Sequence, residues 1–97
     1  MKVYIAGPIT NNPDYLFDFL KAEVNLEADD WEVINPAVVN NSMPKSTTFD
    51  EYMKLCLIML DMADAIYLLS GWEESRGARM EYDRAQEAGK IILKEEK

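Results

Sequence analysis

The residues around Glu81 suggest that an acidic side chain is turned toward the interior of the protein. At about 100° per residue, a helix over this segment places Glu81 on the same side as Ala78, Tyr82, Ala85 and Gly89. Small residues favour close packing on a sheet, and burial of a carboxylate costs free energy unless the group is paired or used. Glu81 is therefore a candidate nucleophile or general base in a poorly hydrated pocket, the alternative being an inward salt bridge.

The run G-W-E-E-S-R-G-A just before this helix contains residues suited to bind a ligand. Ser75 at the start of the helix, with Gly77 and Ala78 behind it, would present free N–H groups to an anion, although helix capping alone explains Ser75 equally well. Trp72 could stack on a nucleobase, or it could be a hydrophobic lid or a subunit contact.

A second candidate loop, A-G-P-I-T-N-N, follows the first apolar run of the chain. Gly7, followed by Pro8, would let a ligand approach the backbone closely, and Thr10, Asn11 and Asn12 supply uncharged hydrogen-bonding groups. The loop has no lysine and lacks the GxxxxGK[ST] spacing of a P-loop. A simple strand-to-helix turn with caps is the alternative.

Alternating strands and helices are expected to position these two loops. Strands are predicted over residues 2–6, 32–35, 63–69 and 90–93. Helices are predicted from residue 13 to about 28, from 48 to 61 and from 75 to 88, with a long loop over residues 37–48 and a frayed tail over 94–97. This alternation predicts a small doubly wound α/β fold with a parallel four-stranded sheet of order 2-1-3-4.

The predicted strand order brings the two candidate loops together. Because the first and third strands are neighbours, residues 7–12 and 70–77 should border one crevice at the carboxyl ends of the strands. The first helix is expected to turn one apolar side inward, formed by Tyr15, Leu16, Phe19, Leu20 and Val24. The second should do the same with Phe49, Tyr52, Met53, Cys56, Met59 and Leu60.

Composition narrows the classes of function. A length of 97 residues suits one domain over residues 1–97, and an apolar content of 48% predicts a folded core. Ten basic and 18 acidic residues give a net charge of −8. This charge argues against a nucleic-acid polymer or an anionic membrane surface as a partner, but not against a single nucleotide.

Cysteine and histidine usage excludes several chemistries. The sequence has no histidine and one cysteine, Cys56, so we expect no Ser-His or Cys-His catalysis within one chain, no internal disulfide, no metal and no other cofactor. No apolar run is long enough for a membrane span or a signal peptide, and we therefore expect a reducing, cytoplasmic compartment.

Three runs of the sequence resemble the nucleoside 2-deoxyribosyltransferase superfamily: V-Y-I-A-G-P-I-T, A-D-A-I-Y-L-L, and S-R-G-A-R-M-E-Y-D-R-A with A-G-K-I-I after it. The resemblance covers essentially the whole chain and is greatest to small phage and bacterial proteins with a G-W-E-x-S-x-G-A-x-x-E run. It implies a flavodoxin/Rossmann-like three-layer sandwich. It also implies an enzyme whose glutamate attacks the anomeric carbon of a nucleoside and forms a glycosyl-enzyme intermediate.

The resemblance assigns roles to particular positions. Glu81 matches the glutamate nucleophile, and Ser75 matches a serine that contacts a 5′-phosphate. Tyr4 matches a tyrosine that lines the active site, and Gly7 matches the glycine of the first loop. We therefore take Pro8, Thr10, Trp72 and Gly77, together with Ser75, Tyr4 and Gly7, as candidate substrate-binding residues.

The sequence departs from these relatives at three places. Cys56 stands where they carry an aspartate that assists the leaving base, so either the site is impaired or Asp61, Asp64 or a loop acid takes over this role. Thr10 stands where the hydrolases have an arginine that helps to hold the phosphate. The chain also ends before a C-terminal region that completes a neighbouring subunit's pocket in relatives.

Three functions are consistent with these patterns. The first is a nucleoside or deoxynucleotide N-glycosyl hydrolase or 2-deoxyribosyltransferase with Glu81 as nucleophile, and the second is a non-catalytic nucleotide-binding module, as Cys56 suggests. The third is a small interaction protein in which Glu81 is merely salt-bridged. We also expect a homo-oligomer whose contact uses the apolar second helix, specifically Met53, Leu55, Leu57, Ile58 and Met59.

Overall fold

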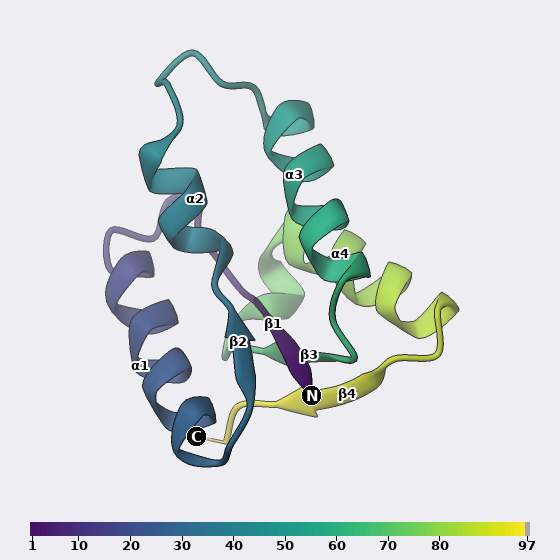
Figure 1. Cartoon of the computed structure of the whole chain (residues 1–97). Coiled ribbons are helices and arrows are strands. Elements are labelled where there is room, and N and C mark those ends of the chain that lie inside the picture. Colours follow the sequence, from purple (N-terminus) through teal and green to yellow (C-terminus); the bar gives the residue numbers. More distant parts are fainter. Residues whose placement is uncertain (97) are drawn as a thin grey trace.

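A parallel sheet with helices on both faces forms the framework of the protein (Figure 1). The computed structural model describes residues 1–96. Its strands are β1 (Lys2–Ala6), β2 (Glu32–Ile34), β3 (Ala65–Leu68) and β4 (Ile91–Lys94). Its helices are α1 (Tyr15–Ala28), α2 (Pro36–Ser42), α3 (Phe49–Asp61) and α4 (Arg76–Glu87), with a 3₁₀ turn, η1 (Trp72–Glu74), before α4.

The order of the strands is β2-β1-β3-β4 and all neighbours are parallel, which confirms the predicted doubly wound fold. Side chains alternate along β1, so that Val3 and Ile5 face α1 while Tyr4 and Ala6 face α3 and α4. Two buried clusters result, one on each face of the sheet. The central strands are covered on both faces, as their continuous apolar sequences predicted.

The expected inward face of α1 is right for Phe19 and for Tyr15, which packs on the core, but wrong for Leu16, Leu20 and Val24. Phe19, Ala22 and Leu26 are buried, whereas Leu20 and Val24 are 52% and 56% exposed. Both sets have helical spacing, so periodicity alone does not separate them. The small Ala22 side chain allows the helix to approach the sheet closely, and this contact decides which face is covered.

The long loop predicted over residues 37–48 is wrong for residues 37–42, because helix α2 begins at Pro36 and ends at Ser42, and right for residues 43–48. The side chain of Asn35 caps this helix by accepting a hydrogen bond of 3.0 Å from the Ala37 N–H. Proline suits the first position of a helix, since its missing N–H would have no partner there. The seven residues of α2 are too few to show an apolar period, and the Asn-Pro pair was the available signal.

The tail is more ordered than predicted. Strand β4 includes Lys94, and the N–H of Glu95 donates a hydrogen bond of 2.8 Å to the carbonyl of Leu68. The Glu95 carboxylate also accepts a bond of 2.8 Å from the Ser70 N–H. The last residue of the predicted frayed tail, Lys97, lies outside the described residues.

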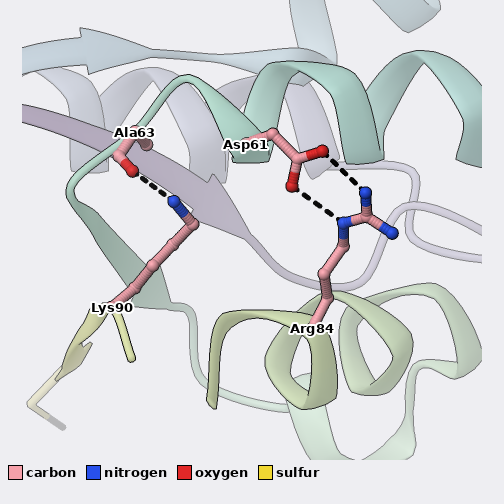
Figure 2. Close-up of polar contacts among 4 residues, drawn as sticks. All are labelled: Asp61, Ala63, Arg84 and Lys90. Carbon is pink, nitrogen blue, oxygen red and sulfur yellow. Dashed lines mark hydrogen bonds and ion pairs between the residues drawn. The ribbon is translucent and has the colours of Figure 1, made fainter. Parts of the chain in front are cut away.

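Polar contacts hold the end of α3 against α4 and the start of β4 (Figure 2). Arg84 donates two hydrogen bonds to Asp61, of 2.8 and 2.6 Å, and Lys90 donates one of 2.6 Å to the carbonyl of Ala63. At the other end of α3, Thr48 and Glu51 form a reciprocal capping box. The helix that carries Cys56 is therefore fixed at both ends. Among residues 1–96, no helix is long and apolar enough to cross a membrane.

Candidate functional site

A cleft of about 860 Å³ lies where the loops after β1 and β3 meet. Tyr4 and Gly7 line it from the first strand and its loop, and Ser75 and Gly77 line it from the start of α4. Cys56 of α3 and the end of α2 complete the wall. This is the crevice that the strand order predicted, since neighbouring parallel strands whose connections diverge leave a gap at their carboxyl ends.

Glu81 is buried at this cleft with 6% of its surface exposed. The hydroxyl of Tyr4 donates a hydrogen bond to Oε2 of Glu81. No lysine or arginine within residues 1–96 forms an ion pair with this carboxylate. The expected inward face of α4 is confirmed for Ala78, Glu81 and Ala85. Gly89 was expected on the same face but is exposed, because it follows the end of the helix. The inward salt bridge, on which the interaction-protein hypothesis depended, is absent from the described part of the chain.

Burial gives Glu81 its acid–base properties. Loss of hydration raises the pKa of Glu81 from its ordinary value of 4.5 to about 7, although hydrogen bonds from Tyr4 and Cys56 act in the opposite direction. Burial and the neighbouring carboxylate raise the pKa of the Cys56 thiol to about 11. The same two causes hold the pKa of Tyr4 well above its usual range. Near neutral pH, Tyr4 and Cys56 are protonated donors around a carboxyl group that titrates.

Cys56 lies beside Glu81, at the position where relatives carry an aspartate. Two of the acids suggested to replace this aspartate lie outside the cleft. Asp61 is paired with Arg84 at the far end of α3. The Asp64 carboxylate accepts a hydrogen bond of 2.9 Å from the backbone N–H of Lys2, at the amino-terminal edge of the sheet. Neither Asp61 nor Asp64 lines the cleft, and the acid that does so besides Glu81 is Glu74 of η1.

The start of α4 combines a cap with a close helix contact. The hydroxyl of Ser75 accepts a hydrogen bond of 3.2 Å from the Ala78 N–H, as its predicted role as a cap requires. A Cβ on Gly77 would lie 3.2 Å from the sulfur of Met53, so glycine here lets α4 approach α3. The first turn of α4 therefore faces the cleft with N–H groups that have no partner within the helix.

The two loops touch each other through glycines. A Cβ on Gly7 would lie only 2.7 Å from Leu69, and one on Gly71 would lie 3.3 Å from Pro8. Gly71 also has a positive φ of 89°, which disfavours other residues. Sequence reasoning selected Gly7 and Pro8 but not Gly71, whose position after the third strand was the available signal.

The polar residues of the first loop have different settings. Thr10 and Asn11 are exposed and border the cleft. The side chain of Asn12 donates hydrogen bonds of 3.0 Å to the Pro8 carbonyl and 3.1 Å to Asp18. Asn12 therefore stabilises the loop itself, as the alternative of a capped turn suggested, while Thr10 and Asn11 remain available to a ligand.

Trp72 does not line the cleft. The Trp72 ring packs against the Tyr82 ring, with 4.7 Å between their centroids. The amino group of Lys94 lies 5.9 Å from the centroid of the Trp72 ring. Trp72 therefore packs with Tyr82 against the buried cluster on the α4 face of the sheet and offers no stacking surface to a ligand in the cleft. The suggested role as a base-stacking residue has no support in this geometry.

Arg76 and Asn40 line the cleft but were missed from the sequence. Arg76 is the first residue of α4, and its guanidinium lies 4.6 Å from the centroid of the Phe49 ring. Asn40 comes from α2, which the sequence did not reveal. The signal for Arg76 was its place next to Ser75, whereas the contribution of Asn40 depends on a helix too short to recognise.

The protein is a small doubly wound α/β protein in which helix α4 carries a buried carboxyl group that forms no ion pair within residues 1–96. The chain belongs to the family described as "Domain of unknown function (DUF4406)", whose model matches residues 1–94. The comparison with curated proteins gave no match. Among residues 1–96, histidine, cysteine, aspartate and glutamate form no group of three that could hold a metal ion.

Proposed function

We propose that the protein is an N-glycosyl hydrolase or 2-deoxyribosyltransferase that acts on deoxynucleosides or their 5′-monophosphates, with Glu81 as the nucleophile. The observation that carries this proposal is a buried carboxyl group that has no cationic partner among residues 1–96 and is oriented by the Tyr4 hydroxyl beside a cleft of about 860 Å³. A volume of this size is typical of sites for small molecules.

In the proposed reaction, the ionised carboxylate of Glu81 attacks the anomeric carbon of the sugar. A C–O bond forms, the bond from this carbon to the base nitrogen breaks, and its electron pair leaves with the base, which takes a proton. Water, or a second base in a transferase, then displaces Glu81 from the sugar. Tyr4 orients the carboxylate, and the poorly hydrated setting favours its attack on a carbon that gains positive charge.

The phosphate of a nucleotide would bind at the start of α4. The first turn of this helix presents N–H groups to the cleft, and an anion is favoured at this end of a helix. The guanidinium of Arg76 lies at the same place and forms no ion pair within residues 1–96. Arg76 thus supplies the positive charge that an arginine provides in the hydrolases at the position of Thr10. Glu74 or water would deliver the proton to the leaving base, because Asp61 and Asp64 lie outside the cleft.

The release of free base tests the proposal. Wild-type protein is incubated with each of the four common deoxynucleoside 5′-monophosphates, and free bases are separated by chromatography. We expect release from at least one substrate, loss of this release in Glu81→Gln, and retention in Glu87→Gln, which changes an exposed acid of the same helix. Absence of release from all four, or equal release by Glu81→Gln, would overturn the assignment.

A non-catalytic nucleotide-binding module is the second candidate, and Cys56 favours it. A thiol whose pKa is about 11 is neutral at physiological pH and does not replace an ionised aspartate. Calorimetry that shows nucleotide binding without release of base would support this function. In that case Cys56→Asp tests whether the site is a decayed enzyme, since restored cleavage is then expected.

We also propose that the chain forms a homo-oligomer, with a different contact from the one expected. On α3, Ile58 is 61% exposed, but Met53 is buried and the other apolar residues named for that helix are half-buried. Helix α1 carries more exposed apolar surface. Its apolar face consists of Leu16, Phe17, Leu20 and Val24, which are between 39% and 66% exposed. A contact through this face would cover apolar surface left open by the fold.

A further inference from the structure

Asn40 lines the cleft close to Cys56 and, through Cys56, to Glu81. Helix α2 places its side chain beside Cys56, where a hydrogen bond from Asn40 lowers the pKa of the thiol and so partly offsets the effect of burial. Cys56 in turn contacts Glu81. Asn40 therefore lies one side chain away from the carboxyl group that carries the proposed function.

The side-chain oxygen of Asn40 is buried and accepts no hydrogen bond from any residue within 1–96. Other asparagines of the protein contrast with this one. Asn35 uses both ends of its amide, accepting from Ala37 and donating to Glu23. Buried polar atoms are almost always paired in folded proteins, because an unpaired one loses its hydration without compensation. Asn40 therefore keeps an unused acceptor next to the candidate site.

We propose that Asn40 is a substrate-recognition residue of the cleft, whose amide accepts a hydrogen bond from an N–H or O–H group of the bound nucleoside. This inference rests on the proposed function, because it assumes a nucleoside or nucleotide as the ligand. Rotation about the bond between Cβ and Cγ would turn the buried oxygen toward the ligand, and this torsion has broad preferences in asparagine.

The chemistry of an amide suits this position. It offers an acceptor and a donor side by side, which is the arrangement that matches the edge of a nucleobase. It is also neutral, so it recognises a ligand without placing a second negative charge near Glu81. The donor could come from the exocyclic amino group of the base or from the 3′-hydroxyl of the sugar, and these two sources can be separated experimentally.

Calorimetric titrations in the Glu81→Gln background test the inference, because binding is then measured without turnover. The ligands are dAMP and dCMP, their analogues with hydrogen in place of the amino group, and their 2′,3′-dideoxy counterparts. Asn40→Leu has a similar shape but no hydrogen-bonding group, and Asn40→Ala serves as a second variant. Asn25→Leu, an exposed position of α1 outside the cleft, is the matched control.

We expect Asn40→Leu to weaken binding by about fivefold for ligands that carry the recognised donor, which is the typical effect of one neutral hydrogen bond. If Asn40 recognises the amino group, Asn40→Leu should not weaken binding of the analogues that lack this group. If Asn40 recognises the 3′-hydroxyl, Asn40→Leu should not weaken binding of the dideoxy ligands. An equal loss for all ligands, or no loss for any, would overturn the inference while leaving the proposed function intact. Absence of binding by the Asn25→Leu control and its parent would instead refute the proposed function and, with it, this inference.

Unfolding in urea provides a readout that needs no ligand. Because Asn40→Leu removes an unpaired buried acceptor, we expect its unfolding midpoint to equal or exceed that of the wild type. A clearly lower midpoint in both Asn40→Leu and Asn40→Ala would show that Asn40 holds the fold together. That result would overturn the recognition role.

Discussion

Replacing Glu81 by glutamine should change how the stability of the protein depends on pH. In the folded protein the pKa of Glu81 is about 7, against an ordinary value of 4.5 that applies to the unfolded chain. The folded state therefore binds this proton more tightly than the unfolded state. Stability from this group is complete below about pH 4.5 and is lost as the pH rises to about 7, above which the loss is constant.

The size of this effect follows from the two pKa values. Each pKa unit corresponds to about 1.4 kcal/mol, so ionisation of Glu81 lowers the free energy of unfolding by about 3 kcal/mol between pH 4.5 and pH 8. Glutamine has nearly the same shape and stays neutral. The free energy of unfolding of Glu81→Gln minus that of the wild type should therefore increase by about 3 kcal/mol as the pH rises over this range.

Urea unfolding followed by the fluorescence of Trp31 and Trp72 measures this difference. The titrations are done at fixed protein concentration at several pH values from 4 to 8.5, with Glu87→Gln as the control for an exposed acid on the same helix. A difference between Glu81→Gln and wild type that stays constant with pH would refute the reasoning. So would a change of the opposite sign, because it would mean that the folded protein stabilises the charged carboxylate.

Three further predictions concern catalysis, packing and assembly. Tyr4→Phe removes a hydrogen bond that lowers the pKa of Glu81. In the wild type we expect the rate of base release to rise with pH near pH 7, and in Tyr4→Phe this rise should move to higher pH. An unchanged pH–rate profile would contradict this. Gly7→Ala brings a Cβ to 2.7 Å from Leu69 and should lower the free energy of unfolding, measured by urea titration, by about 1–3 kcal/mol. A variant as stable as the wild type would show that the loop moves to make room for the Cβ at little cost. Leu20→Glu places a charge in the apolar face of α1 and should reduce the mass found by light scattering to that of a monomer; a monomeric wild type would exclude this contact.

Local patterns were sufficient to predict most of the framework and part of the site. The apolar strands, the Ser75 cap and the strand order follow from short-range preferences and from the rule that crossovers are right-handed. The inward direction of Glu81 follows from helical geometry, because neighbours three and four positions away share its face. Gly7 was selected because a glycine directly after a buried strand permits close approach to the backbone; we expected a ligand there, whereas the structure places the Leu69 side chain there.

The errors arose where long-range contacts decide the outcome. Residues on two sides of α1 have helical spacing, and only docking on the sheet selects Ala22 and Leu26 over Leu20. Trp72 follows a strand at the expected edge, but its ring packs on Tyr82 because α4 offers an apolar surface there. The short helix α2 is stabilised by a cap and by buried Pro36, not by a period that a sequence can display.

The amino-acid sequence by itself determined the order of the strands and of the three longer helices, and the types of side chain at the ends of β1 and β3, because both depend on neighbours along the chain. Only the tertiary structure decided that Cys56 and Tyr4 surround Glu81, and that, within residues 1–96, Glu81 has no cationic partner and the side-chain oxygen of Asn40 has no hydrogen-bond partner. These properties depend on desolvation and on partners up to 77 positions apart, as for Tyr4 and Glu81. No local pattern specifies such contacts, since packing of the whole chain creates them.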